Sequence, residues 1–382
     1  MDRKHRLRRV APAFAIAVVS ASLLASCGDS TGPKNKQNAL RPAGPYARQI
    51  LHLTEPFFWI AVVIGVGVVA ATFYVALRFR EKPGQPRMVK QLHGNTALEI
   101  SWTIIPAIIL AIMAVPTVAT IFSLAKKPTG PNVVHVTVSA RQWWWQFTYT
   151  DPDTGGIVTA NEMHIPAGVP VSLTLQGPPP CSGAGCYANG VIHSFWVPAL
   201  NGKKDVVPGR SQFLKLEADK PGVYDGQCAE YCGLSHANMR MKVIAQPMAD
   251  FQTWVKQQLT PLTPAASAQF DNYNKQWTCL TCHSDVPTKP GAIAPNLTRI
   301  ADRCGFAGDT FAVNEQNLTN WIYDAPSMKP MQENPKNPLQ PLVGMPNFSS
   351  VGMTKTQANE IAKFLLSATA SGPIPPSYCT SP

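Results

Sequence analysis

The chain of 382 residues is longer than one ordinary domain, so its length predicts two or three structural units. Its 36 prolines and 26 glycines indicate many turns and linkers and argue against a helical bundle. Part of the formal charge of +11 lies in the first ten residues, and no stripe of basic residues with interleaved aromatics remains to predict nucleic-acid binding.

Residues 1–27 have the layout of an export signal. A basic start precedes an apolar run that ends in Leu-Ala-Ser-Cys, which is similar to a lipoprotein box. We therefore expect a signal peptide at residues 1–26 and a lipidated N-terminus at Cys27; an uncleaved transmembrane anchor is the alternative. The polar, proline-containing residues 27–50 predict a tether outside the membrane.

Residues 51–128 predict a transmembrane hairpin. Two apolar segments, at about residues 57–77 and 100–124, are each long enough for the roughly 20 residues that a spanning helix needs. The loop between them is strongly basic, which places it on the cytoplasmic side. Pro106 and Pro116 lie within the second span, where a neighbouring helix can compensate the lost backbone bonds, so we expect a packing partner in the membrane.

Glu99 stands where the second span enters its apolar stretch. A carboxylate at this depth is costly unless it faces protein or water, which is compatible with proton handling. The helix dipole would also favour an acid at a helix N-terminus, so a purely interfacial role is the simpler reading of the residue alone.

From Val133 the apolar pattern changes to a period of two. Short β-branched and aromatic runs separated by glycine and proline predict an all-β sandwich or barrel at residues 129–258, ending in a short helix at about 250–259. Cys181 and Cys186 lie in a Gly- and Pro-rich interruption that they could close as a disulfide in an oxidising compartment. The runs are VVHVTVSA, QWWWQFTY, VPVSLTLQG, VIHSFWVP, SQFLKLEA and MKVIAQ.

The loop GQCAEYCGLSHANM, between the last two predicted strands, concentrates candidate metal ligands. Two thiols, an imidazole and a thioether form a soft donor set that suits copper better than magnesium or calcium. Two thiolates four residues apart can bridge a pair of coppers, and a disulfide between them is the alternative. Because protein ligands fill every position, the set indicates electron transfer rather than hydrolysis. The candidates are Cys228, Glu230, Cys232, His236 and Met239, with His193 at the end of an earlier strand.

After a linker at residues 259–266, residues 267–382 contain the sequence Cys279-Leu-Thr-Cys282-His283. C-x-x-C-H is typical of covalent c-haem attachment, with two thioethers and a proximal His ligand. A thioredoxin-like dithiol and half a zinc site are the alternatives. This motif also predicts an exported chain, because c-type haem is attached outside the membrane.

We expect a methionine as the second axial ligand of the haem iron, because this ligand raises the reduction potential. Met345 fits best, since it precedes the predicted terminal helix by one loop. The competitors are Met328, Met331 and Met353.

Together the motifs resemble subunit II of the haem-copper cytochrome c oxidases, in the caa-type variety with a fused C-terminal cytochrome c domain. The matching stretches are HGNTALEISWTIIP, RQWWWQFTY, VIHSFWVPAL, GKKDVVPGR, GQCAEYCGLSHANM and CLTCH. The resemblance implies a multidomain fold with a two-helix transmembrane hairpin, an all-β cupredoxin barrel and an all-α cytochrome c domain. It also implies a bacterial plasma membrane protein with its copper and haem domains on the outer face.

The resemblance also implies roles for individual residues. A dinuclear copper A centre would bind to the loop ligands and His193, with Glu230 contributing its backbone carbonyl. The Glu230 side chain would help to hold magnesium against subunit I. Glu99 would lie at the mouth of a proton channel into subunit I, and electrons would enter at Trp143.

The implied function is electron transfer in a proton-pumping oxidase. Electrons would pass from haem c to the copper pair and on to haem a in subunit I, where oxygen is reduced to water. The implied partners are subunits I and III and an upstream cytochrome c or quinol-cytochrome c reductase complex. A membrane-tethered copper-delivery protein is the alternative, and a quinol-oxidising relative would lack the copper ligands.

Three features depart from the family pattern or lie outside it. Gly190 occupies a position where the family usually has an aspartate, three residues before the first copper histidine. The interruption with Cys181 and Cys186 adjoins it. Cys304 and Cys379 belong to no motif, and a disulfide between them is one option for fixing the C-terminus.

Overall fold

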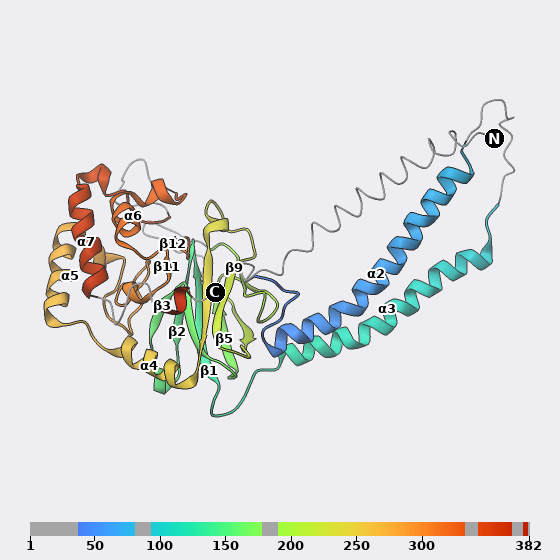
Figure 1. Ribbon diagram of the computed structural model, residues 1–382, viewed down its shortest axis with the longest axis horizontal. Helices are drawn as coiled ribbons and strands as arrows, with labels where there is room; N and C mark the ends of the chain where they lie inside the picture. The colour runs from blue at the N-terminus through green and yellow to red at the C-terminus, as the bar shows by residue number, and fades with distance from the viewer. Residues whose placement is uncertain (1–36, 81–92, 178–189, 333–342, 369–376, 381–382) are drawn as a thin grey trace, which may run out of the picture.

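The computed structural model describes residues 37–80, 93–177, 190–332, 343–368 and 377–380. The expected signal peptide, Cys27 and the interruption with Cys181 and Cys186 lie outside these residues. The described chain forms a long helical hairpin, a β-sandwich and a C-terminal helical unit packed against the sandwich (Figure 1).

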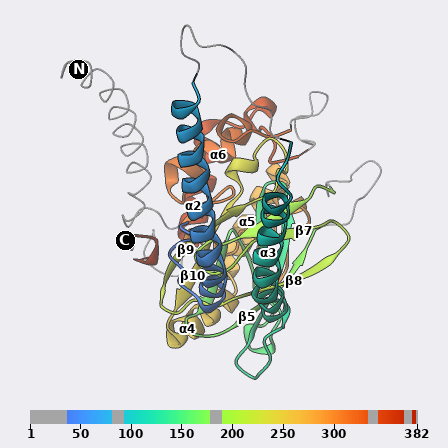
Figure 2. The same ribbon diagram turned by 90° about the vertical axis from the view of Figure 1, so that its right-hand side faces the viewer.

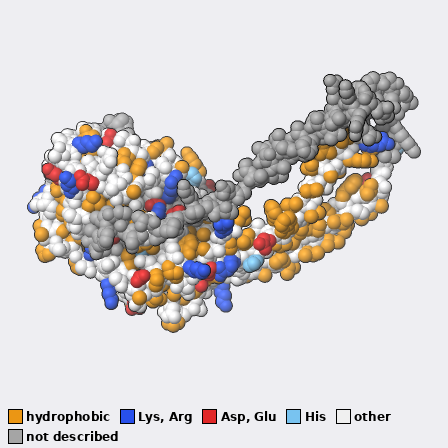
Figure 3. Space-filling view, viewed as in Figure 1, with side chains coloured by type: hydrophobic (Ala, Val, Ile, Leu, Met, Phe, Trp, Pro, Cys, Tyr) orange, Lys and Arg blue, Asp and Glu red, His pale blue; other side chains and the backbone are white. Residues whose placement is uncertain are grey.

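The hairpin consists of α2 (Pro45–Arg78) and α3 (Thr96–Ala125), which run side by side in both ribbon views (Figures 1 and 2). Both helices are long and apolar enough to cross a membrane, and almost none of their most apolar stretch is buried. Apolar side chains cover the hairpin surface, whereas charged side chains are scattered over the globular part (Figure 3). The expected pair of helices long enough to span a membrane is therefore present.

The helices extend beyond the expected spans. The 34 residues of α2 are about 51 Å long, whereas the hydrocarbon core of a bilayer is about 30 Å thick. The start of α2 and the end of α3 lie next to the sandwich, and we call this part of the hairpin the stalk (Figure 1).

Polar contacts join this stalk firmly to the sandwich. Arg48 makes a two-pronged ion pair with Asp219. Lys215 donates from Nζ to the carbonyls of Ser123 (2.8 Å) and Lys126 (3.1 Å), which satisfies carbonyls left open where α3 ends.

Two five-stranded sheets form the sandwich. Their strand orders are β3-β2-β1-β5-β8 and β4-β10-β9-β6-β7, and one apolar core draws side chains from both. Strand β1 alternates between buried and more exposed side chains, as expected for a strand with one face on a core. The strands are β1 (Val134–Arg141), β2 (Trp144–Tyr149), β3 (Val158–Ala160), β4 (Glu162–Pro166), β5 (Val171–Gln176), β6 (His193–Trp196), β7 (Lys204–Val206), β8 (Ser211–Leu216), β9 (Gly222–Cys228) and β10 (Arg240–Gln246).

The structure corrects the prediction of which strands flank the metal loop. The loop joins β9 to β10, whereas the sequence predicted that it follows SQFLKLEA, which is β8. Strand β9 reads GVYDGQC, and its two glycines and its aspartate give it low β propensity. Pairing with β10 along six residues and with β6 stabilises it as a strand.

The C-terminal unit follows α4 (Met248–Leu259). Helix α5 (Pro264–Trp277) begins within the expected linker, because Thr263 caps it and Pro264 suits the first helical turn. Helices α6 (Glu315–Met328) and α7 (Lys355–Ala368) and a small ribbon of β11 (Gly305–Phe306) and β12 (Phe311–Ala312) surround a second apolar core. A disulfide joins Cys304 to Cys379.

Candidate metal centre

Two neighbouring strands bring His193 to the metal loop. His193 is the first residue of β6, and Cys228 is the last residue of β9 and pairs with Phe195. The loop is fixed at this point by a hydrogen bond from the Cys228 amide to the Met239 carbonyl (2.9 Å). His193 Nδ1 consequently lies 3.9 Å from Cys228 Sγ.

All six predicted donors gather around the two cysteine sulfurs. The sulfurs are 3.8 Å apart, and both cysteines are free thiols, so the alternative of a disulfide, with its bond of about 2.05 Å, does not occur. Cys232 Sγ is 3.6 Å from His236 Nδ1 and 3.9 Å from Met239 Sδ. Cys228 Sγ is 3.2 Å from the carbonyl oxygen of Glu230.

The donors are shielded from water to different degrees. His193, Cys228, Cys232 and Met239 are buried, at 5% exposure or less, and His236 is half-buried. The side chain of Glu230 is exposed. The centre is thus closed towards the sandwich core and approaches the surface along one side of the loop.

The two thiols differ in acidity. The hydrogen bond between them lowers the pKa of Cys228, and His193 lowers it further. The same hydrogen bond, together with burial, raises the pKa of Cys232. In the metal-free chain Cys228 therefore ionises first, and metal binding would release the proton of Cys232.

These residues fit a pair of soft metal ions. A metal ion bonds a thiolate at about 2.3 Å, so sulfurs 3.8 Å apart can both contact one ion. Each sulfur also has one imidazole nitrogen within 4 Å, which gives the two halves of the site similar donors. With the thioether of Met239 and the carbonyl of Glu230 as weaker donors, the set matches copper in its softness.

Trp143 contacts this loop directly. Its indole Nε1 donates to the carbonyl of Cys232 (2.9 Å), and Gln142 Nε2 donates to the same oxygen (2.6 Å). Trp143 is only 5% exposed, and the C-terminal unit contacts its backbone, since Lys329 Nζ donates to its carbonyl oxygen (2.9 Å).

Glu99 lies in the first turn of α3 and takes part in capping that helix. The Asn95 side chain accepts a hydrogen bond from the Leu98 amide (3.2 Å), and Glu99 Oε1 accepts one from the Asn95 amide (3.3 Å). This reciprocal pair resembles a capping box. The geometry gives the carboxylate a structural role that does not require a proton channel.

The C-x-x-C-H residues lie at the start of the C-terminal unit. Cys279 and Cys282 are free thiols on either side of a short turn. His283 donates from Nδ1 to the Pro295 carbonyl (2.6 Å), which leaves Nε2 available as a ligand. Burial lowers the pKa of His283, so the imidazole is held in the neutral form that binds metals.

The methionine candidates lie around the second core. Met345 packs against this core, and its amide contacts Met331 Sδ (3.2 Å). Met353 is buried within the core, and Met328 is half-buried at the end of α6.

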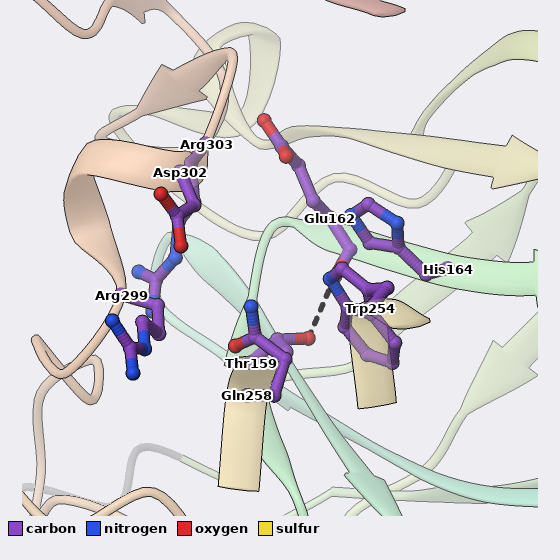
Figure 4. A pocket seen from close by; sticks show the side chains of 8 residues that line it. All are labelled: Thr159, Glu162, His164, Trp254, Gln258, Arg299, Asp302 and Arg303. Carbon is purple, nitrogen blue, oxygen red and sulfur yellow. Dashed lines mark hydrogen bonds between the residues drawn. The ribbon is translucent and has the colours of Figure 1, made fainter. Parts of the chain in front are cut away.

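Sequence reasoning missed the residues that join the two globular parts. Lys329 is 3% exposed and Glu162 is 1% exposed, and both bond across the junction. Glu162 and His164 face Arg299, Asp302 and Arg303 around a small pocket (Figure 4). A single lysine or glutamate carries no pattern that separates it from a solvated surface residue, so no signal in the sequence could have identified them.

Comparison with known proteins gives consistent matches. Residues 185–246 match the family "Cytochrome C oxidase subunit II, periplasmic domain", and residues 33–120 match the transmembrane domain of the same subunit. Cytochrome c oxidase subunit 2 of Alkalihalophilus pseudofirmus is 37% identical over 308 residues, which cover 78% of this chain and 85% of the relative. The subunit of Bacillus sp. strain PS3 is 34% identical over 339 residues, with coverages of 83% and 89%. Quinol oxidase subunit 2 of Bacillus cereus is 32% identical over 231 residues, with coverages of 59% and 74%.

Proposed function

Because the chain belongs to the cytochrome c oxidase subunit II family, we propose that it is the electron-transfer subunit of a caa-type haem-copper oxidase. Members of this family are subunits of an oxidoreductase complex, so partner subunits are implied. The proposed route runs from a covalent haem c on the C-terminal unit to a dinuclear copper A centre, and on to haem a in subunit I, where oxygen is reduced.

The observation that carries this proposal is the set of six donors around two buried thiols 3.8 Å apart. Copper bound there would supply reversible one-electron chemistry. The residues His193, Cys228, Cys232, His236, Met239 and the carbonyl of Glu230 hold the site, and strands β6, β9 and β10 restrict their movement. A rigid, dry site requires little rearrangement when its charge changes, which suits a relay.

The exposed side of the loop supports contact with subunit I. Glu230 is exposed beside the site, so its carboxylate is free to share a magnesium ion with another subunit. Tyr231 and Leu234 are 75% and 63% exposed, which is unusual for large apolar side chains and supports burial against a partner.

The haem assignment rests on residues of the C-terminal unit. Cys279 and Cys282 would form the thioethers, and His283, oriented by Pro295, would bind the iron. Met345 is the proposed second axial ligand. A match over 83% of the chain, as with the Bacillus sp. subunit, necessarily includes part of this unit, which supports a shared extension.

Trp143 and Glu99 keep the roles that the family resemblance implies. The bond from the Trp143 indole to the Cys232 carbonyl supports Trp143 as the point where electrons reach the copper loop. Glu99 would serve the proton channel of subunit I in addition to capping α3. Subunit III and an upstream cytochrome c or reductase complex complete the proposed partners.

The proposed location is the bacterial plasma membrane. The hairpin anchors the chain, and the sandwich and C-terminal unit lie on the outer face. A cleaved signal at residues 1–26 and a lipid on Cys27 complete this topology.

Metal and haem content tests the function. The full-length complex should hold two tightly bound coppers and one covalent haem per chain. Cys232→Ser should lose copper and keep haem, whereas Cys279→Ser should keep copper and impair haem attachment, so each variant controls for the other. A single exchangeable copper would instead support copper delivery, although the burial of four donors argues against so labile a site.

A further inference from the structure

The C-terminal unit covers one face of the metal loop. The Arg240 amide donates to the Gly308 carbonyl (2.9 Å), and the Ser235 hydroxyl donates to the Pro330 carbonyl (2.6 Å). Lys242 forms an ion pair with Asp309. These bonds connect the loop and the start of β10 to the ribbon and to the end of α6.

Lys329 lies at the centre of this contact. Its ammonium group donates to three carbonyl oxygens: Ala307 (2.7 Å) in its own unit, and Trp143 (2.9 Å) and Asn238 (2.9 Å) in the sandwich. With its side chain 3% exposed, water cannot replace these partners. A buried amino group must find all its hydrogen-bond partners within the protein, so the three carbonyls and the lysine require one relative position of the two units.

Gly308 shows how closely the units approach at this point. A Cβ on Gly308 would lie 2.3 Å from the Asn238 oxygen, 2.8 Å from Lys329 Nζ and 2.9 Å from the Trp143 oxygen. No side chain fits in this space, so the Gly308 backbone contacts the sandwich backbone directly beside Lys329.

We propose that Lys329 is a positioning residue that fixes the C-terminal unit over Trp143, so that this face of the metal loop is closed to any other protein. The functional part of this inference rests on the proposed function, in which Trp143 passes electrons to the loop. An external donor protein would then have to deliver its electrons to the C-terminal unit. The exposed side with Tyr231 and Leu234 remains open to a partner subunit.

Hydrogen exchange measured by mass spectrometry on the purified complex tests the inference. Lys329→Met removes the ammonium group and keeps an unbranched side chain of similar length. The amides of Arg240, Cys304 and Gly305, which all bond across the junction, should exchange about tenfold faster or more, whereas strand β5 should not change. Lys355→Met, at an exposed lysine of the same unit, should have no effect.

A second variant opens the junction from the opposite side. Gly308→Ala inserts a methyl group beside Lys329 and should accelerate the same amides. Gly168→Ala is its matched control, because Gly168 has a similar φ (74° against 76°) but no atom within 4 Å of its Cβ position.

Two outcomes would overturn the inference: unchanged exchange at the junction in both variants, or equal acceleration in β5, which would show a general structural role. Copper and haem contents measured on the same samples keep the two hypotheses apart. Their absence would refute the proposed function, whereas the exchange rates would still report on Lys329.

Discussion

Replacing Glu162 by glutamine should remove a pH dependence from the stability of the sandwich and the C-terminal unit. Glu162 Oε1 accepts hydrogen bonds from the Cys304 amide (2.5 Å) and the Gly305 amide (3.0 Å) across the junction. Its Oε2 is buried and has no hydrogen-bond partner among the described residues. Burial and, to a lesser degree, the carboxylate of Asp309 raise the pKa of Glu162 from 4.5 to about 8.

The neighbours of Glu162 include groups that raise its pKa and groups that lower it. Lys242, Arg303 and the Gly305 amide favour the ionised form of Glu162, but burial and Asp309 outweigh them. His164 and Asp302 also line the pocket beside it (Figure 4). Because the pKa is higher in the folded than in the unfolded chain, the folded chain binds more protons between pH 4.5 and 8, and its stability falls as pH rises through this range.

The size of the effect follows from the shift. One pKa unit corresponds to about 1.36 kcal/mol, and Glu162 is already half ionised at pH 8, so raising the pH from 6 to 8 should cost the native chain about 2 kcal/mol. For a unit of this size, 1 kcal/mol changes the melting temperature by about 2–4 °C. Glutamine keeps an oxygen acceptor for both amides and does not titrate, so Glu162→Gln should lose this decline.

Calorimetry of the native chain and Glu162→Gln at pH 6 and pH 8 tests the prediction. The relevant quantity is the difference between variant and native chain, because burial lowers the pKa of Lys329 to about 7 and gives the opposite slope in both chains. From pH 6 to pH 8 that difference should grow by about 2 kcal/mol. Glu162→Ala should destabilise at both pH values by roughly 2–6 kcal/mol, since two buried amides lose their acceptor. Parallel curves for the native chain and Glu162→Gln would refute the reasoning.

Four further predictions concern single sites. Met239→Leu conserves volume at a fully buried position, so stability should change by less than about 1.5 kcal/mol while the copper absorption spectrum shifts; an unchanged spectrum would remove Met239 from the ligands. Met345→Leu should convert the haem to a high-spin spectrum, and a low-spin spectrum would require another axial methionine. Glu99→Gln retains an acceptor for the cap of α3, so helix content should be unchanged while oxidase turnover slows; a normal rate measured with oxygen uptake would leave only the capping role. Replacing Cys304 and Cys379 by serine opens a loop with a sequence separation of 75 residues and should lower the unfolding free energy, measured with urea, by about 4–5 kcal/mol on the chain-entropy account; a loss below about 1 kcal/mol would contradict that account.

Periodicity allowed most of the fold to be predicted. The apolar lengths gave both candidate membrane helices, and alternation gave β1, β2, β5, β6, β8 and β10, because each repeats a simple physical requirement along the chain. Strand β9 was missed because its stability comes from pairing with β10 and β6 rather than from its own residues.

The candidate site likewise contains residues that local sequence patterns predict and residues that they do not. Five of its six donors are close in sequence, so spacing alone suggested the loop. The sixth, His193, was a candidate at the end of an earlier strand, and the pairing of β6 with β9 brings it to the loop. The junction at Lys329 and Glu162 depends on contacts between residues 91 to 186 positions apart. Such contacts follow from how the units pack and leave no local pattern.

Because the stalk is bonded to the sandwich, the rotation of the two helices about their axes determines the orientation of the sandwich. Arg48 and Lys215 bind the ends of α2 and α3 to the sandwich, so we expect the sandwich to turn together with the helices. Each residue of an α-helix adds about 100° and 1.5 Å. One residue inserted into both helices of the stalk should therefore turn Tyr231 and Leu234 by about 100°, whereas four residues should bring them back to within about 40° of the original direction and displace the loop by about 6 Å. The number of residues in the stalk helices thus sets the direction in which the metal loop faces.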